Sequence, residues 1–108
     1  MIEREKILEL AAEELADANT KHPPMFSSAH EVYAVLKEEI EEAMDEFSAI
    51  GNGMKVLWNN VKEDLDTDGP IFAIQYDAIR CVQELIQVIA MCDKATQRYS
   101  RKVLNITE

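Results

Sequence analysis

One apolar stretch in the C-terminal half of the chain establishes the fold class: residues 78–92 read AIRCVQELIQVIAMC. Its main apolar side chains recur at intervals of three and four residues, which is the spacing of one face of an α-helix. These side chains are Ala78, Val82, Leu85, Ile86 and Ile89. Five more extend the apolar surface around the same helix: Ile74, Cys81, Val88, Met91 and Cys92. A helix of this kind has to be covered on several sides.

Three shorter amphipathic segments precede this helix, and the whole pattern predicts an all-α antiparallel helical bundle in a single domain, residues 1–108. The three segments predict helices over residues 2–19, 28–50 and 53–65, and the long helix covers residues 70–99, followed by a polar tail at 101–108. The breaks between them are Pro23-Pro24, Gly51-Asn52-Gly53 and the Asp-rich turn before Pro70. Because the long helix is apolar on more sides than one small chain can cover, we expect a second copy to complete a four-helix core.

Capping residues mark the start of two predicted helices. Ser28 followed by Glu31 forms a capping box at the start of the second helix. Asp68 or Gly69 is placed to cap the last helix, with Pro70 at its first position. Both helices therefore have a defined beginning in the sequence.

The chain is strongly acidic, with 11 Lys and Arg against 21 Asp and Glu and a formal net charge of −10. This charge repels a nucleic-acid backbone and an anionic membrane surface, which argues against both as partners. The N-terminal residues hold no apolar run of signal-peptide length, and Cys81 and Cys92 lie about 16 Å apart on one predicted helix, too far to form a disulfide. We therefore expect a reduced, cytoplasmic protein that binds cations, or compact ligands that carry cations with them.

The run from Lys37 to Glu46 carries six acidic side chains, and helical geometry divides them into two groups. Glu39, Glu42 and Glu46 flank the apolar face, whereas Glu38, Glu41 and Asp45 point further toward solvent. Glu39 and Glu42 are one turn apart, so both can point into a groove beside a neighbouring helix. Like charges in such a groove repel unless a cation lies between them.

The last predicted helix offers a matching pair, Glu84 and Gln87, one turn apart and opposite its main apolar stripe. Arg80 and Met91 lie on the same side, with Asp77 close by. Lys94, Arg98 and Arg101 continue along this face. These basic residues either offset the helix macrodipole near its C-terminal end or hold phosphate oxygens whose cation rests one to three turns back.

The spacing Glu38-Glu39-x-x-Glu42, followed by Glu84-x-x-Gln87, resembles the E-E-x-x-E … E-x-x-D signature of the all-α nucleoside triphosphate pyrophosphohydrolases, the MazG-like group. The surrounding residues 30–37 and 84–91 resemble phage-encoded members in particular. The resemblance covers residues 28–99. It implies a Mg²⁺ site on facing helices, with Mn²⁺ as a substitute, in a homodimer or homotetramer.

The resemblance implies that Glu39 and Glu42 match the first pair of metal ligands and Glu84 the third. It also implies cleavage of a nucleoside triphosphate into a monophosphate and pyrophosphate. In this hypothesis Glu38 supports the ligand pair and Gln87 orients a bound water, while Lys94 and Arg98 hold phosphate. Mg²⁺ suits the chemistry because it prefers oxygen ligands, keeps bound waters and neutralises phosphate charge.

Two other interpretations remain open. Gln87 stands where the family pattern has Asp, which favours a non-catalytic oligomeric or nucleotide-binding module of the same fold. Asp64-x-Asp66-x-Asp68-Gly69 reproduces the first half of an EF-hand calcium loop, although position twelve is Gln75 and no second loop pairs with it. A helix-capping turn explains the same residues.

Overall fold

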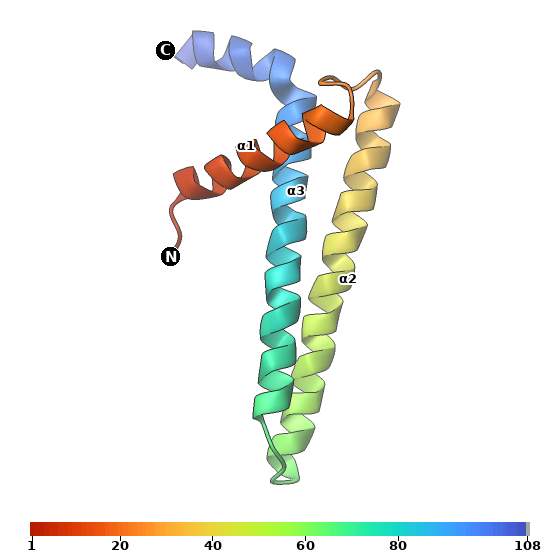
Figure 1. Ribbon diagram of the computed structural model, residues 1–108, viewed down its shortest axis with the longest axis vertical. Helices are drawn as coiled ribbons and strands as arrows, with labels where there is room; N and C mark the ends of the chain where they lie inside the picture. Colours follow the sequence, from red (N-terminus) through yellow and green to blue (C-terminus); the bar gives the residue numbers. More distant parts are fainter. Residues whose placement is uncertain (108) are drawn as a thin grey trace. The chain divides into compact units, whose positions relative to one another are not determined.

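The computed structural model describes the backbone of residues 1–107 and the side chains of residues 1–97. In this part the chain forms three helices and no strand: α1 (Arg4–Lys21), α2 (Ala29–Lys62) and α3 (Asp68–Thr107) (Figure 1). The predicted all-α fold class is confirmed. Among the described residues, no helix combines the length and the apolar character that crossing a membrane requires.

Helix α2 corrects the prediction of two helices, over 28–50 and 53–65. The helix runs unbroken from Ala29 to Lys62, and Gly51 and Gly53 lie inside it without positive φ. The apolar spacing continues through this point, since Phe47, Ile50, Met54 and Leu57 follow one another at intervals of three and four. A continuous apolar face therefore outweighs the weak helix propensity of two glycines.

The predicted cap of α2 is confirmed, whereas the ends of α3 differ from the prediction. The Glu31 N–H donates to Ser28 Oγ at 3.1 Å, and the Glu31 carboxylate reaches back to the Ser27 hydroxyl at 2.8 Å. At the start of α3 the cap is Asp66, whose carboxylate accepts the N–H groups of Asp68 and Gly69 at 3.3 and 3.2 Å. The helix then continues to Thr107, beyond the predicted end at 99, because residues 99–107 contain no Gly or Pro to stop it.

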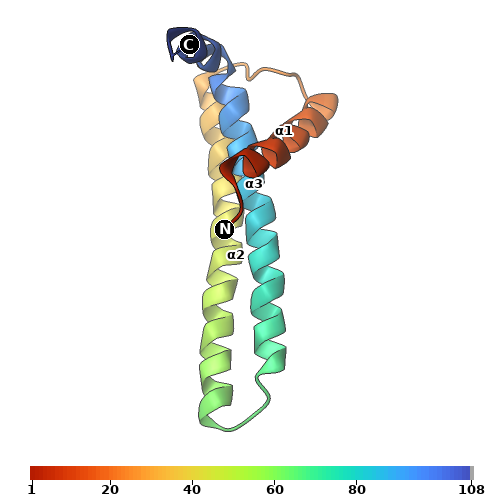
Figure 2. The ribbon, with the colours of Figure 1, turned by 90° about the vertical axis from the view of Figure 1, so that its left-hand side faces the viewer.

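The chain divides into two compact units. Unit 1 comprises residues 1–39 and 86–108, so it holds α1, the first turns of α2 and the C-terminal part of α3. Ala11 of α1 and Ala90 of α3 are fully buried. Figures 1 and 2 both show α1 crossing this part of α3. Small side chains at such a crossing allow two helix backbones to approach closely.

Unit 2 comprises residues 40–85 and is a helical hairpin in which the rest of α2 and the beginning of α3 run antiparallel, side by side (Figures 1 and 2). Its interior is small: Ala43 and Cys81 are buried, and the Cys81 thiol donates to the Ala43 carbonyl oxygen at 3.7 Å. Large apolar side chains remain exposed, among them Phe47 at 68% and Trp58 at 60%. The hairpin therefore presents an extensive apolar surface.

Gly53 of α2 lies next to the Ile74 side chain of α3, and Gly51 provides a matched control. A Cβ added at Gly53 would stand 2.7 Å from Ile74 Cγ1, whereas a Cβ at Gly51 would meet nothing within 4 Å. We expect Gly53→Ala to lower the free energy of unfolding by about 1–3 kcal/mol, because the β-branched Ile74 side chain has little freedom to move aside. Gly51→Ala should instead raise it by about 0.5–1 kcal/mol. Urea denaturation of both variants measures the difference, and equal effects would contradict the close contact.

Candidate functional site

Glu39, Glu42 and Glu84 form the group of acidic side chains, within the described part of the chain, that could hold one metal ion. In unit 2, carboxylate oxygens of Glu42 on α2 and Glu84 on α3 lie within 4.8 Å of each other. Glu39 precedes Glu42 by one turn of the continuous helix α2, so both side chains leave that helix on the same side. These are the three residues that the sequence predicts as metal ligands.

Burial and neighbouring carboxylates disfavour the charged form of Glu84. Its Oε2 atom is buried and has no hydrogen-bond partner among the described residues. The pKa of Glu84 is raised above its ordinary value, first because burial disfavours the charged form. Glu42 raises this pKa further, by a hydrogen bond to the protonated form and by charge repulsion, and Glu46 adds repulsion. At Glu84, burial and the repulsion from neighbouring carboxylates therefore outweigh the compensation that Arg80 provides.

Arg80 is a cation near Glu84, but its guanidinium forms its hydrogen bonds with Glu46 and Tyr76. Its Nε donates to Glu46 Oε1 at 2.9 Å, and its Nη1 donates to the Tyr76 hydroxyl at 3.3 Å. Both contacts raise the pKa of the guanidinium above its ordinary value. Arg80 lowers the pKa of Glu84, but this effect is smaller than those that raise it. Arg80 thus compensates Glu46 more than it compensates the pair formed by Glu42 and Glu84.

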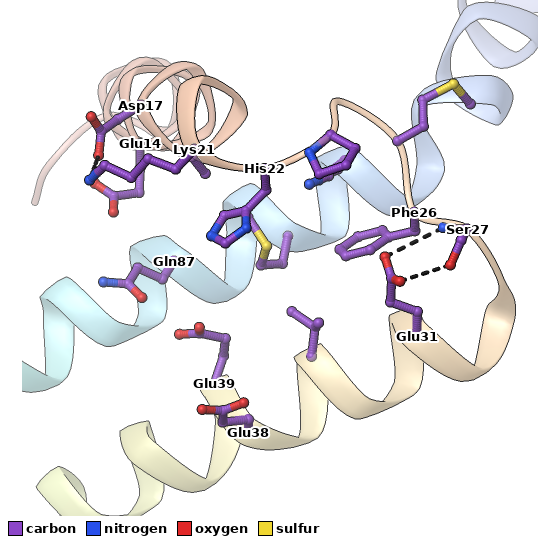
Figure 3. Close-up of a pocket in the computed structure, with 16 residues that line it drawn as sticks. Glu14, Asp17, Lys21, His22, Phe26, Ser27, Glu31, Glu38, Glu39 and Gln87 are labelled. Carbon is purple, nitrogen blue, oxygen red and sulfur yellow. Dashed lines mark hydrogen bonds and ion pairs between the residues drawn. The ribbon is translucent and has the colours of Figure 1, made fainter.

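A cavity of about 710 Å³ opens in unit 1 between the end of α1, the connection to α2, the first turns of α2 and the C-terminal part of α3. In Figure 3, Gln87 of α3 and Glu39 of α2 extend toward each other across this space, with Glu38 beside Glu39. The apolar part of the lining comprises Ala18, Pro23, Met25, Phe26, Val35 and Met91. The volume and the mixture of apolar walls with a few polar groups are typical of small-molecule sites.

Lys94, one of the two predicted phosphate ligands, lines this cavity and is only 7% exposed. Its ammonium group stands over the Phe26 ring, 4.7 Å from the centroid. None of the carboxylates in the described part of unit 1 makes an ion pair with it. The other predicted phosphate ligand, Arg98, lies outside the described side chains.

A comparison with models of known protein families gave no match, and searches of curated proteins and of solved structures gave none either. The function therefore has to be inferred from the residues of the chain itself.

Several lining residues of the cavity were not predicted as site residues. Phe26 and His22 belong to the connection between α1 and α2, and Glu14 and Asp17 belong to the last turns of α1. Figure 3 shows His22 pointing between these turns and α3. The sequence feature that could have indicated this part of the lining is the apolar pair Met25-Phe26, which directly follows two prolines. Large apolar side chains in a short connection usually cover a neighbouring element.

The contacts of the Asp-rich turn between α2 and α3 favour a helix-capping role over calcium binding. Asp66 uses its carboxylate to accept two backbone N–H groups, and its carbonyl oxygen accepts the Asn60 side-chain amide at 2.7 Å. Asp64 has a left-handed backbone with φ of 54°, as is common for Asp in turns. Neither residue belongs to the metal-compatible group found among the described residues.

Proposed function

We propose that this chain is a Mg²⁺-dependent nucleotide pyrophosphohydrolase that cleaves a nucleoside triphosphate into a monophosphate and pyrophosphate. The observation that carries the proposal is the buried Oε2 atom of Glu84, which has no hydrogen-bond partner among the described residues and belongs to a carboxylate close to that of Glu42. A carboxylate in this position needs a proton or a cation. The donor set of Glu39, Glu42 and Glu84 consists of hard oxygen ligands, which suits Mg²⁺ or Mn²⁺.

The remaining residues would act on the water and on the substrate. Mg²⁺ would supply charge neutralisation at the phosphate oxygens and lower the pKa of a bound water. Gln87, which faces Glu39 across the cavity, would orient the attacking water. The water oxygen forms a bond to the α-phosphorus, the bond to the bridging oxygen breaks, and pyrophosphate leaves with the electron pair. Glu38, exposed beside Glu39, would accept the proton of the water.

The test is release of pyrophosphate from a panel of ribonucleoside and deoxyribonucleoside triphosphates, with and without Mg²⁺. We expect Mg²⁺-dependent release of one pyrophosphate per monophosphate formed. Release of inorganic phosphate alone would contradict cleavage at the α-phosphorus. Absence of hydrolysis of every triphosphate, by protein whose helical circular dichroism spectrum is intact, would remove the enzymatic proposal.

A non-catalytic nucleotide-binding module of the same fold is the second candidate, because Gln87 is an uncharged amide at a position where the resembled family has a carboxylate. Gln87→Asp separates the two candidates. If Gln87 orients the water in a working site, the substitution should lower turnover by about 10–100-fold, since a small misplacement of a reacting group costs that much. Activity that appears only in Gln87→Asp would favour the non-catalytic module.

We also propose that a second copy of the chain covers the apolar surface of unit 2, which gives a four-helix core. Unit 2 leaves large apolar side chains exposed, among them Met44 at 62%, Phe47 at 68% and Trp58 at 60%. An exposed apolar surface of this kind marks a site of interaction with a partner. An apolar groove of about 310 Å³ between the helices of unit 2, lined by Phe47, Met44 and Leu85 among others, offers a place for apolar side chains of the partner.

The proposed setting is the cytoplasm, where thiols stay reduced. Cys81 and Cys92 are both free cysteines.

A further inference from the structure

Three residues of α2 in unit 2 share one side of that helix at heptad spacing. Met44 and Trp58 are both exposed, and Gly51 lies midway between them, seven residues from each. Seven residues are almost two turns of an α-helix, so the three positions face the same way. Met44 lines the apolar groove of unit 2. One side of α2 therefore carries the groove near one end and the chain's single tryptophan toward the other.

The groove and Trp58 of one chain lie too far apart to meet. Fourteen residues separate Met44 from Trp58, which is about 21 Å along the axis of α2. The indole is largely exposed, with the Lys62 ammonium 5.8 Å from the centroid of its ring. The groove has a volume of about 310 Å³ and walls from both α2 and α3. Tryptophan is enriched among the residues that fill an apolar pocket of a partner protein, so the two features are complementary.

A two-fold axis at Gly51 would bring each Trp58 to the groove of the other copy. A two-fold interface is reciprocal, so if Trp58 of one copy reaches the other copy near Met44, the reverse contact forms as well. Both contacts form together when the two α2 helices run antiparallel and cross at the midpoint of these residues. That midpoint is Gly51, where an added Cβ would meet nothing within 4 Å. The missing side chain allows the partner helix to approach closely.

The charges of unit 2 favour the same orientation. If two hairpins paired with their turns at the same end, the acidic side chains of both turns would lie close together and repel. The antiparallel arrangement separates the turns by more than the Debye length of about 8 Å. It also brings Lys62, eleven residues after Gly51, level with the partner's Glu41, ten residues before it. The turn carboxylates belong to Glu63, Asp64, Asp66 and Asp68.

We propose that Trp58 of a second copy fills the groove of unit 2, so that the two hairpins pack antiparallel and their α2 helices cross at Gly51. This placement rests on the proposed pairing of two copies and gives it a direction and a register. Phe47 and Leu85, which line the groove, would contact the indole ring of the partner. The acidic turns then lie at opposite ends of the four-helix core.

The fluorescence of Trp58 tests which side chain fills the groove. We expect the emission maximum to move to shorter wavelength as the protein concentration rises through the range in which sedimentation velocity detects dimers, because the indole leaves water. Trp58→Gln should lower the association constant by at least about 30-fold. Phe72→Gln is the matched control and should change it by less than about threefold. Phe72 is an exposed aromatic residue of unit 2, but it lies nine residues from the buried Cys81 and hence on the opposite side of α3.

The distance between two copies of one spin label tests the orientation. The label is attached to Glu63→Cys in a Cys92→Ser background, in which the remaining cysteine, Cys81, is buried. With the crossing at Gly51, each label lies twelve residues from the crossing, so we expect the two labels about 36 Å apart. Pairing with the turns at the same end would bring them within about 20 Å, since packed helices lie about 8–10 Å apart.

The outcomes separate the placement of Trp58 from the pairing itself. A dimer in which the emission of Trp58 stays unchanged, or in which Trp58→Gln and Phe72→Gln weaken association equally, would overturn the placement and leave the pairing intact. A short distance between the labels would overturn the antiparallel orientation. A chain that stays monomeric at every concentration would contradict the pairing and the placement together. Circular dichroism of each variant establishes that its helices are intact.

Discussion

Replacing Glu84 with glutamine is expected to weaken Mg²⁺ or Mn²⁺ binding by at least about tenfold and, without metal, to raise the melting temperature by several degrees. The two effects have one cause. The Glu84 carboxylate is partly buried close to that of Glu42, with Glu46 adding to the negative charge. A bound metal ion would offset the repulsion between these carboxylates. A glutamine at this position removes the repulsion without a metal, but its amide supplies no negative charge to bind one.

The pH dependence of the metal-free protein follows from the raised pKa of Glu84. The folded state holds this proton more tightly than the unfolded state, where the pKa is near 4.5. The contribution of Glu84 to stability is therefore most favourable below the unfolded pKa, and it is lost as the pH rises through the folded pKa. Metal affinity changes in the opposite direction, because the carboxylate must lose its proton to bind the ion. In Glu84→Gln both dependences should become weaker.

Differential scanning calorimetry across this pH range, with EDTA and then with saturating Mn²⁺, measures both effects. Asp45→Asn is the matched control, since it removes one exposed negative charge from α2 outside the metal-compatible group. This control should keep metal binding and the wild-type pH dependence. A Glu84→Gln variant that binds Mn²⁺ as tightly as the wild type would show that Glu84 is no ligand, and a lower melting temperature in EDTA would contradict the repulsion.

The helices of this chain were predictable where local pattern determines them. The apolar spacing predicted α1 and the main part of α3, and the pair Ser28 and Glu31 predicted the start of α2. The predicted break at Gly51-Asn52-Gly53 was wrong. It rested on the weak helix propensity of glycine, without the packing of this segment against α3. Gly53 serves a packing purpose there, since Ile74 occupies the space of its missing side chain. A contact between residues so far apart in sequence leaves no local trace.

The candidate site was likewise predictable only where helical spacing determines the positions of its residues. Helical spacing predicted Glu39, Glu42 and Glu84 as one group of ligands, because 3.6 residues per turn bring Glu39 and Glu42 to one side of their helix. The structure shows that these three residues could hold one metal ion, and their role as ligands stays a prediction. The ion pair between Glu46 and Arg80 was not predicted, although the sequence places Glu46 beside the apolar face of its helix and Arg80 on the same side of its helix as Glu84. The partnership of Lys94 with Phe26 depends on the connection after α1, whose course no periodic pattern specifies.

Replacing Phe47 with glutamate is expected to convert the proposed dimer into a monomer, with the association constant lowered by at least about 30-fold. Phe47 lines the apolar groove of unit 2 and is 68% exposed, so in a single chain the ring contributes little to the fold. In the proposed four-helix core it would be buried against the partner, and a carboxylate there would be desolvated without a partner of opposite charge.

Sedimentation velocity over a range of concentrations distinguishes the two states, and Tyr33→Glu provides the matched control. Tyr33 is an aromatic residue of α2 with a similar exposure of 70%, but it belongs to unit 1 and lies outside the groove. Added salt should strengthen the wild-type dimer, because each chain carries a net charge of −10 and screening reduces the repulsion between copies. A wild-type chain that stays monomeric at every concentration and salt level would contradict the proposed core. Equal dissociation of both variants would contradict the assignment of the interface to unit 2, since the two substitutions add the same charge and differ in where they add it.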